Sequence, residues 1–175
     1  FMKEKIEINH TTKILDIGCS RGDALRNFAK FGDLDLYGID RRKEECDGFV
    51  FKECDLENEK IPFPDNTFDI IYSKSVIEHV FNTENFLNES LRVLKPGGIF
   101  IGLTPDWASQ SQTFWDDFTH VRPFTLKGLR DGLNIVGFKD GQCEYFYQLP
   151  FIWRYPSLKF IPKLISAITT NSMKW

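Results

Sequence analysis

An apolar run that leads into a glycine-rich loop constrains the fold of this chain more than any other feature. The run 14–17 (Ile-Leu-Asp-Ile) has the pattern of a buried strand, and Gly18 and Gly22 follow it. Glycines there allow a tight turn and the close approach of a ligand to the backbone. A helix start with Ser20 as its cap and Asp23 as the reciprocal acid is expected next. Its unpaired N–H groups suit a carboxylate or a phosphate.

Strand-like and helix-like segments alternate along the rest of the chain. Apolar runs predict further strands at 36–39, 49–51, 68–72 and 99–103, and helical spacing predicts helices at 83–94 and 125–136. Residues 138–146 also have strand character. The alternation predicts an α/β fold with a Rossmann-like, doubly wound and mostly parallel sheet, whose ligands bind at the carboxyl ends of the strands. The intervening segment 104–124 is expected to be a long functional loop.

Composition narrows the class of protein. The chain has 175 residues, enough for a single domain, and a net charge of -3, which does not indicate a nucleic-acid surface. The spacing of the four cysteines (Cys19, Cys46, Cys54 and Cys143) fits neither a zinc site nor a disulfide framework. We therefore expect reduced thiols, a cytoplasmic location and no metal. No stretch is long and apolar enough to span a membrane.

Acidic residues stand at the ends of three successive predicted strands, at Asp16, Asp40 and Asp55. Asp40 lies about 20 residues beyond the glycine loop, where a carboxylate can accept hydrogen bonds from ribose hydroxyls. A phosphate-binding Walker loop is excluded because no Gly-Lys-Ser/Thr follows. A dinucleotide fingerprint has a different glycine spacing. Even so, Arg41 and Arg42 could meet a 2′-phosphate, which leaves an NADP-dependent oxidoreductase open as an alternative.

Together these motifs resemble those of class I S-adenosylmethionine-dependent methyltransferases. The resemblance runs through 14–22, 63–71, 75–80 and 91–98 and covers residues 14–104 in the family order. It implies S-adenosylmethionine as cofactor and methyl transfer as reaction, with a non-catalytic cofactor-binding module as a further alternative.

The same resemblance assigns cofactor-binding roles along the chain. The glycine loop would hold the homocysteine part, Asp55 with Leu56 the adenine, and Ser73 with Lys74 the sulfur end. Asp40 would bind the ribose, and Arg41 beside it is a further candidate cofactor-binding residue. The loop residues concerned are Asp16, Gly18, Cys19, Ser20 and Gly22.

The segment 113–125 resembles one found in small-molecule and polysaccharide methyltransferases. The resemblance implies a small-molecule or saccharide acceptor, with oxygen favoured as the methylated atom. His120 is the candidate base or acceptor-positioning group. His79 is open to two interpretations, a general base or a hydrogen-bonded packing residue. Trp107, Trp115 and Phe118 are candidate acceptor walls. The alternative is that this loop is an ordered lid that only packs on the domain.

The apolar segment 150–175 follows a predicted cofactor-binding domain over 1–149. It is expected to pack on that domain, although peripheral contact with a membrane or a partner is an alternative. The resembled family usually ends in an antiparallel strand pair. No convincing final strand follows 138–146, and we expect it beyond Trp175. The sequence does not indicate an oligomeric state.

Overall fold

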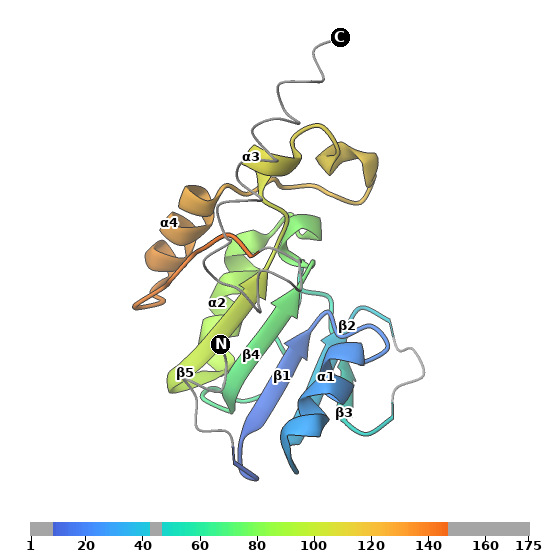
Figure 1. Ribbon diagram of the computed structural model, residues 1–175. Coiled ribbons are helices and arrows are strands. Elements are labelled where there is room, and N and C mark those ends of the chain that lie inside the picture. The colour runs from blue at the N-terminus through green and yellow to red at the C-terminus, as the bar shows by residue number, and fades with distance from the viewer. Residues whose placement is uncertain (1–8, 43–46, 147–175) are drawn as a thin grey trace, which may run out of the picture.

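The computed structural model describes residues 9–42 and 47–146. Within them, strands and helices alternate as the sequence predicts (Figure 1). The strands are β1 (Lys13–Ile17), β2 (Asp35–Asp40), β3 (Val50–Glu53), β4 (Phe68–Lys74) and β5 (Leu94–Leu103). The α-helices are α1 (Asp23–Phe28), α2 (Thr83–Val93), α3 (Trp107–Gln110) and α4 (Leu126–Val136), and short 3-10 turns are η2 (Ala29–Phe31), η3 (Ile77–His79) and η4 (Phe114–Asp116).

The strands form one sheet in the order β3-β2-β1-β4-β5, and every pairing is parallel. The chain therefore runs outward from β1 in one direction through β2 and β3, and returns to the other side of β1 with β4. This reversal makes the carboxyl ends of β1 and β4 the switch point of the sheet, where ligands bind in open α/β folds. The predicted Rossmann-like architecture is confirmed.

Apolar side chains fill both faces of the sheet. On one face, Leu25 and Phe28 of α1 pack with Ile14 and Ile70. On the other face lies a larger cluster that includes side chains from α2 and α4, and its fully buried members include Leu15, Ile17, Ile39, Phe68, Ile71, Phe86 and Val93. Alternate residues of each strand face opposite layers, which explains why apolar residues predominate on both faces of the central strands.

Two local expectations were wrong. Ser20 does not cap α1, because Gly22 holds the cap position with a left-handed backbone (φ 80°) and no side chain bonds there. Residues 138–146 do not form a strand. Asp140 adopts a positive φ of 56°, which breaks the extended backbone that a ladder requires. Phe138 instead packs on the larger cluster, with its ring 5.3 Å from that of Phe100.

The predicted loop 104–124 has internal structure. It contains α3 and η4, and Asp106 forms an isolated parallel bridge with Phe124. The loop lies beyond the carboxyl ends of β4 and β5 (Figure 1). The helix that follows is confirmed as α4, which begins at the cap Thr125, whose hydroxyl accepts a hydrogen bond from the Gly128 N–H at 3.1 Å.

Among the described residues, none of the helices has the length and apolar character needed to cross a bilayer. The predicted C-terminal segment 150–175, with its proposed packing or membrane contact, lies outside those residues.

Candidate functional site

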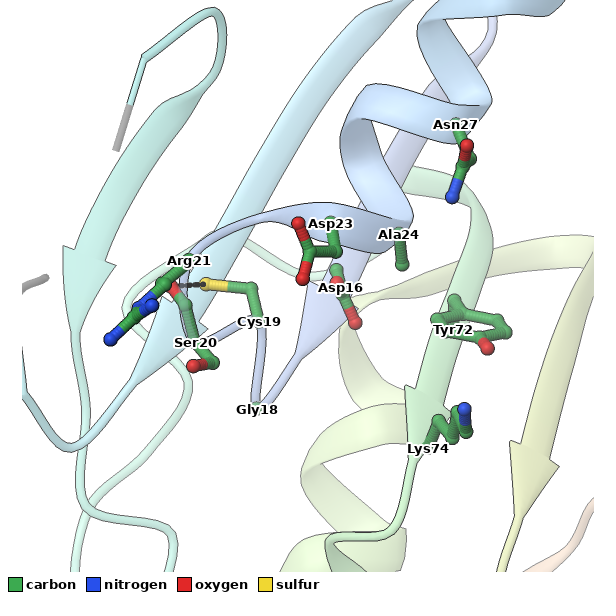
Figure 2. A pocket seen from close by; sticks show the side chains of 10 residues that line it. All are labelled: Asp16, Gly18, Cys19, Ser20, Arg21, Asp23, Ala24, Asn27, Tyr72 and Lys74. Atoms are coloured by element: carbon green, nitrogen blue, oxygen red, sulfur yellow. Dashed lines mark hydrogen bonds between the residues drawn. The ribbon is translucent and has the colours of Figure 1, made fainter. Parts of the chain in front are cut away.

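A hollow of about 270 Å³ opens at the switch point of the sheet, between the glycine loop, the start of α1 and the end of β4 (Figure 2). Among the described residues, its lining comes from two stretches of chain. They contribute Asp16, Gly18, Cys19, Ser20, Arg21, Asp23, Ala24 and Asn27 from the first, and Tyr72 and Lys74 from the second. Of the cofactor-binding residues expected from the sequence, the structure places Asp16, Gly18, Cys19, Ser20 and Lys74 here.

Asp16 is the buried acid of this hollow. Its residue is 3% exposed, and it pairs in register with Tyr72 of the neighbouring strand, so both side chains leave the same face of the sheet. No hydrogen bond from the described residues reaches its carboxylate. Burial raises the pKa of Asp16 to about 7, and the nearby carboxylate of Asp40 contributes further. A positively charged group in the hollow would compensate this desolvated acid.

The glycine loop is tied to β2 and pressed against the segment after β4. The N–H groups of Gly18 and Cys19 both donate to the carbonyl of Ile39, at 2.8 and 3.1 Å. Gly18 has a φ of 76°, and a Cβ added there would lie 2.3 Å from Cγ2 of Val76. Only glycine satisfies both the backbone angle and this contact. The loop thus couples the hollow to η3.

Asp40 stands at the end of β2, as predicted, but its carboxylate braces the glycine loop. Oδ2 accepts from the Ser20 N–H at 2.9 Å, and Oδ1 accepts from the Arg41 N–H at 2.7 Å. Neither Asp40 nor Arg41 lines the hollow. Each carboxylate oxygen has a further lone pair, so these bonds leave Asp40 able to accept from another donor.

The other predicted cofactor residues lie outside the hollow. The hydroxyl of Ser73 is buried and donates to the carbonyl of Ile17 at 3.2 Å, which ties β4 to β1. Asp55 accepts from the Glu57 N–H at 3.1 Å within its own turn, and Leu56 is part of the core. Gly22 caps α1, which sets the direction of the helix.

Sequence reasoning missed several residues that line the hollow. Ala24 and Asn27 lie three apart on α1, so the helical period could have indicated them once the loop was identified. Tyr72 gave no comparable signal, because its position beside Asp16 depends on which strands pair. Burial, followed by the charge of Asp16, raises the pKa of the Tyr72 phenol, which keeps it a neutral hydrogen-bonding group.

The two candidate catalytic histidines meet beside η3. The rings of His79 and His120 lie 4.7 Å apart between centroids, although the two residues belong to segments that are far apart in the chain. Nδ1 of His79 lies 3.1 Å from the carbonyl oxygen of Thr119, and Nδ1 of His120 lies 2.6 Å from that of Phe114. Each ring is thus fixed by the backbone of the 104–124 loop.

A third polar group, which the sequence did not single out, completes this cluster. Glu78 is fully buried, and its Oε2 accepts from the Thr104 hydroxyl at 3.0 Å. Its carbonyl also accepts from the N–H groups of Val121 and Arg122, at 2.8 and 3.1 Å. One ligand atom each of Glu78, His79 and His120 lie within 4.8 Å of one another.

The predicted acceptor walls are only partly assembled. Trp107 and Trp115 lie 6.2 Å apart between ring centroids, and both contact Phe114, a buried residue that the prediction omitted. Phe118 is 98% exposed and joins no such aromatic contact in the described residues. The aromatic cluster of Trp107, Phe114 and Trp115 reaches His120, whose ring lies 4.4 Å from that of Phe114.

The structure combines a parallel sheet, a glycine loop at its switch point and a buried acid beside that loop. This combination is typical of Rossmann-like domains that bind a nucleoside-containing cofactor. Comparison with known proteins makes this specific. Residues 15–102, half of the chain, match the family model described as a methyltransferase domain. The chain belongs to the class I S-adenosylmethionine-dependent methyltransferase family.

Individual relatives of this chain are named as methyltransferases too. Sterol 24-C-methyltransferase erg6 of Aspergillus fumigatus is 31% identical over 157 residues, which cover 83% of this chain and 41% of that protein. The 2-methyl-6-phytyl-1,4-hydroquinone methyltransferase of Synechocystis is 28% identical, over 75% of this chain and 48% of that protein. The chain therefore spans less than half the length of these relatives.

Among solved structures, an S-adenosylmethionine-dependent methyltransferase from Mesorhizobium loti superposes with a TM-score of 0.70 at 19% identity, over 90% of this chain and 88% of that one. A methyltransferase from Archaeoglobus fulgidus does so with a TM-score of 0.65 at 25% identity, over 78% and 65%. At 19% identity, the similarity to the Mesorhizobium loti structure shows the fold alone.

Proposed function

We propose that this domain transfers a methyl group from S-adenosylmethionine to a small-molecule acceptor. The observation that carries the proposal is the Asp16 carboxylate, buried without a hydrogen bond from the described residues at the hollow of the switch point. Lys74 lines the same hollow. Asp16 at the end of β1 and Lys74 at the end of the neighbouring β4 offer an acidic and a basic side chain in one hollow, which fits the ammonium and carboxylate of an amino acid (Figure 2). When bound, the cofactor supplies an already activated methyl group.

The residues of the chain then have binding and orienting tasks. Asp16 would hold the ammonium and Lys74 the carboxylate of the cofactor. Asp40 would accept from ribose hydroxyls while it keeps the loop in place through Ser20. Asp55 and its neighbour Leu56 remain proposed adenine contacts. Alignment and exclusion of water account for most of the rate enhancement in such a displacement.

A small apolar or partly apolar acceptor is favoured by the aromatic cluster of Trp107, Phe114 and Trp115 beyond the strand ends. The relatives whose names state an acceptor act on sterols and a hydroquinone. Oxygen is the proposed methylated atom, because His79 and His120 lie where an acceptor proton could be taken. Methylation on carbon is the second candidate, since the sterol relatives are named as C-methyltransferases.

The first experiment is a calorimetric titration of the purified chain with S-adenosylhomocysteine, with NADPH as the control ligand. We expect micromolar binding of the homocysteine nucleoside and none of NADPH. Binding of NADPH alone would refute the proposal in favour of the oxidoreductase that Arg41 and Arg42 left open.

A screen of sterols, quinols and small saccharides with methyl-labelled S-adenosylmethionine then tests the acceptor class. The position of the label, read by NMR, separates oxygen from carbon. Labelled product on none of these classes, from a chain that binds the cofactor, would contradict the small-molecule proposal.

A further inference from the structure

The cluster of Glu78, His79 and His120 lies at the carboxyl end of β4, beyond the cofactor hollow. Lys74 lines that hollow and ends β4, and η3 begins only a few residues later. Val76, between them, packs under Gly18 of the glycine loop. The cluster is thus mechanically tied to the hollow but uses different side chains.

Glu78 is the member of the cluster whose carboxylate lacks a hydrogen-bond partner for one of its oxygens in the described residues. It is fully buried, and while its Oε2 accepts from Thr104, its Oε1 has no hydrogen-bond partner among the described residues. A buried carboxylate oxygen without a partner is costly, because it loses its hydration and gains nothing in return. A cation at Oε1 would remove this cost.

Both imidazoles are held in the tautomer that a metal ion requires. Nδ1 of His120 faces the Phe114 carbonyl, which can only accept, so this nitrogen carries the hydrogen. Nδ1 of His79 faces the carbonyl and the hydroxyl of Thr119, and that hydroxyl donates its own hydrogen to Asp117 at 2.6 Å. Each ring therefore donates through Nδ1, and Nε2 is the nitrogen that can bind an ion. Backbone carbonyls fix metal-ligating histidines in this way. Nε2 of His120 lies 3.9 Å from Oδ2 of Asp117, which is beyond hydrogen-bond distance.

The distances permit a shared ion. One ligand atom from each of the three residues lies within 4.8 Å of the others. Atoms bound to one zinc ion stand roughly 3–4 Å apart, because each bond is about 2.0–2.2 Å long. A small rearrangement of these side chains would bring one ligand atom from each residue to a shared ion.

We propose that Glu78, His79 and His120 bind one divalent ion of the first transition series, with zinc the best chemical match. Two imidazoles and a carboxylate suit such ions, and a set of three protein ligands leaves a coordination position open. The expectation of no metal rested on cysteine spacing, which does not bear on a site made of Glu and His.

The open position gives this site a role in catalysis. That role rests on the proposed function, whereas the binding of the ion does not. With the ion bound, both imidazoles are its ligands and no longer bases. A hydroxyl oxygen of the acceptor that binds the ion would then release its proton to solvent more readily and become a better nucleophile. The ion would therefore favour oxygen acceptors over carbon ones.

The test measures metal binding alone, without cofactor or acceptor. The full chain is stripped with a chelator and titrated calorimetrically with zinc chloride, and cobalt(II) is added separately so that its visible absorption bands report coordination. We expect one equivalent of zinc to bind. Glu78→Gln, His79→Gln and His120→Gln should each weaken binding on the order of 100-fold and abolish the cobalt bands.

Two further variants sharpen the result. His10→Gln, at an exposed histidine before β1, should bind zinc like the unaltered chain. Thr104→Val removes the hydroxyl that positions Glu78 and should weaken binding by about 10-fold or more. Should Glu78→Gln fail to fold by circular dichroism, His120→Gln decides the matter, because its ring lies nearer the surface.

Several outcomes would overturn the proposal. They are no binding of zinc or cobalt, binding of magnesium only, and binding that survives both histidine substitutions, as adventitious binding by cysteines would. A chain that binds S-adenosylhomocysteine but no metal refutes this inference and leaves the proposed function intact. A chain that binds zinc but not S-adenosylhomocysteine supports the metal site and refutes the proposed function.

Discussion

The hollow beside the glycine loop and the cluster beside η3 lie at the end of the same strand, β4, but they are assembled differently. Most of the hollow comes from one continuous stretch, residues 16–27, which folds as strand, loop and helix. The cluster draws Glu78 and His79 from one segment, Thr104 from the residue that follows β5, and Thr119 and His120 from further along the 104–124 loop. Continuous sites can be identified from a motif, whereas assembled sites depend on the packing of distant segments.

This difference predicts that changes in the hollow affect cofactor affinity and that changes in the cluster do not. The largest effect is expected for Gly18→Ala, because the new Cβ would meet Val76 at 2.3 Å on a backbone with φ of 76°. Such strain costs about 1–3 kcal/mol. We expect a loss of S-adenosylhomocysteine affinity of about 100-fold, measured by calorimetry, and a lower midpoint of urea unfolding.

The matched control is Gly141→Ala. No atom lies within 4 Å of the added Cβ, and the backbone angle is an ordinary one, so neither quantity should change. Equal behaviour of the two variants would show that the glycine loop does not form the cofactor site.

The next effect is a pH dependence that originates at Asp16. Its pKa in the folded chain, about 7, lies above the ordinary value of 3.8. The cofactor ammonium binds the ionised acid, so affinity should fall about tenfold for each pH unit below 7. Calorimetry with S-adenosylhomocysteine between pH 5.5 and about 8 measures this slope.

The stability of the unliganded chain should change in the opposite direction. A raised pKa means that this group stabilises the fold fully below about pH 4 and that the contribution is lost as the pH rises through 7. In Asp16→Asn, both slopes should be reduced. A wild-type affinity that stays flat across this range would separate Asp16 from the ammonium.

A smaller effect is expected at Asp40, which braces the loop and is proposed to bind ribose. Asp40→Ala should weaken S-adenosylhomocysteine binding about tenfold or more. Asp40→Asn keeps an oxygen that can accept from the Ser20 N–H but loses the charge. Equal losses in the two variants would assign the effect to ribose, and a loss in the alanine variant alone would assign it to the loop. Unchanged affinity in both would remove Asp40 from the site.

The smallest effect on cofactor affinity belongs to the cluster. His120→Ala should change S-adenosylhomocysteine affinity by less than about twofold while it lowers acceptor turnover by about 100-fold or more. His10→Ala serves as control and should alter neither. A large loss of cofactor binding in His120→Ala would mean that the cluster supports the hollow structurally, and the contrast drawn above would fail.

Local patterns were sufficient for much of the fold. Buried strands are continuous apolar runs, and α2 carries apolar side chains at helical spacing, so both were predictable. The prediction of a strand at 138–146 was wrong because the local pattern cannot show whether a partner strand is available. Nor can it show that Asp140 will adopt a positive φ. The prediction of Ser20 as the helix cap was wrong because its N–H donates to Asp40 of β2, a contact that the local sequence does not show.

The sequence by itself determined the class of fold, the glycine loop and the acids at the strand ends, since these depend on neighbours within a few residues. Only the tertiary structure decided that Ser73 is a buried brace and that Tyr72 faces Asp16. It also decided that Glu78 lies beside two histidines, with no hydrogen-bond partner for Oε1 in the part of the chain that the structure describes. The physical reason is that strand order, register and loop docking set these contacts. They follow from the packing of the whole domain and leave no periodic signal in the chain.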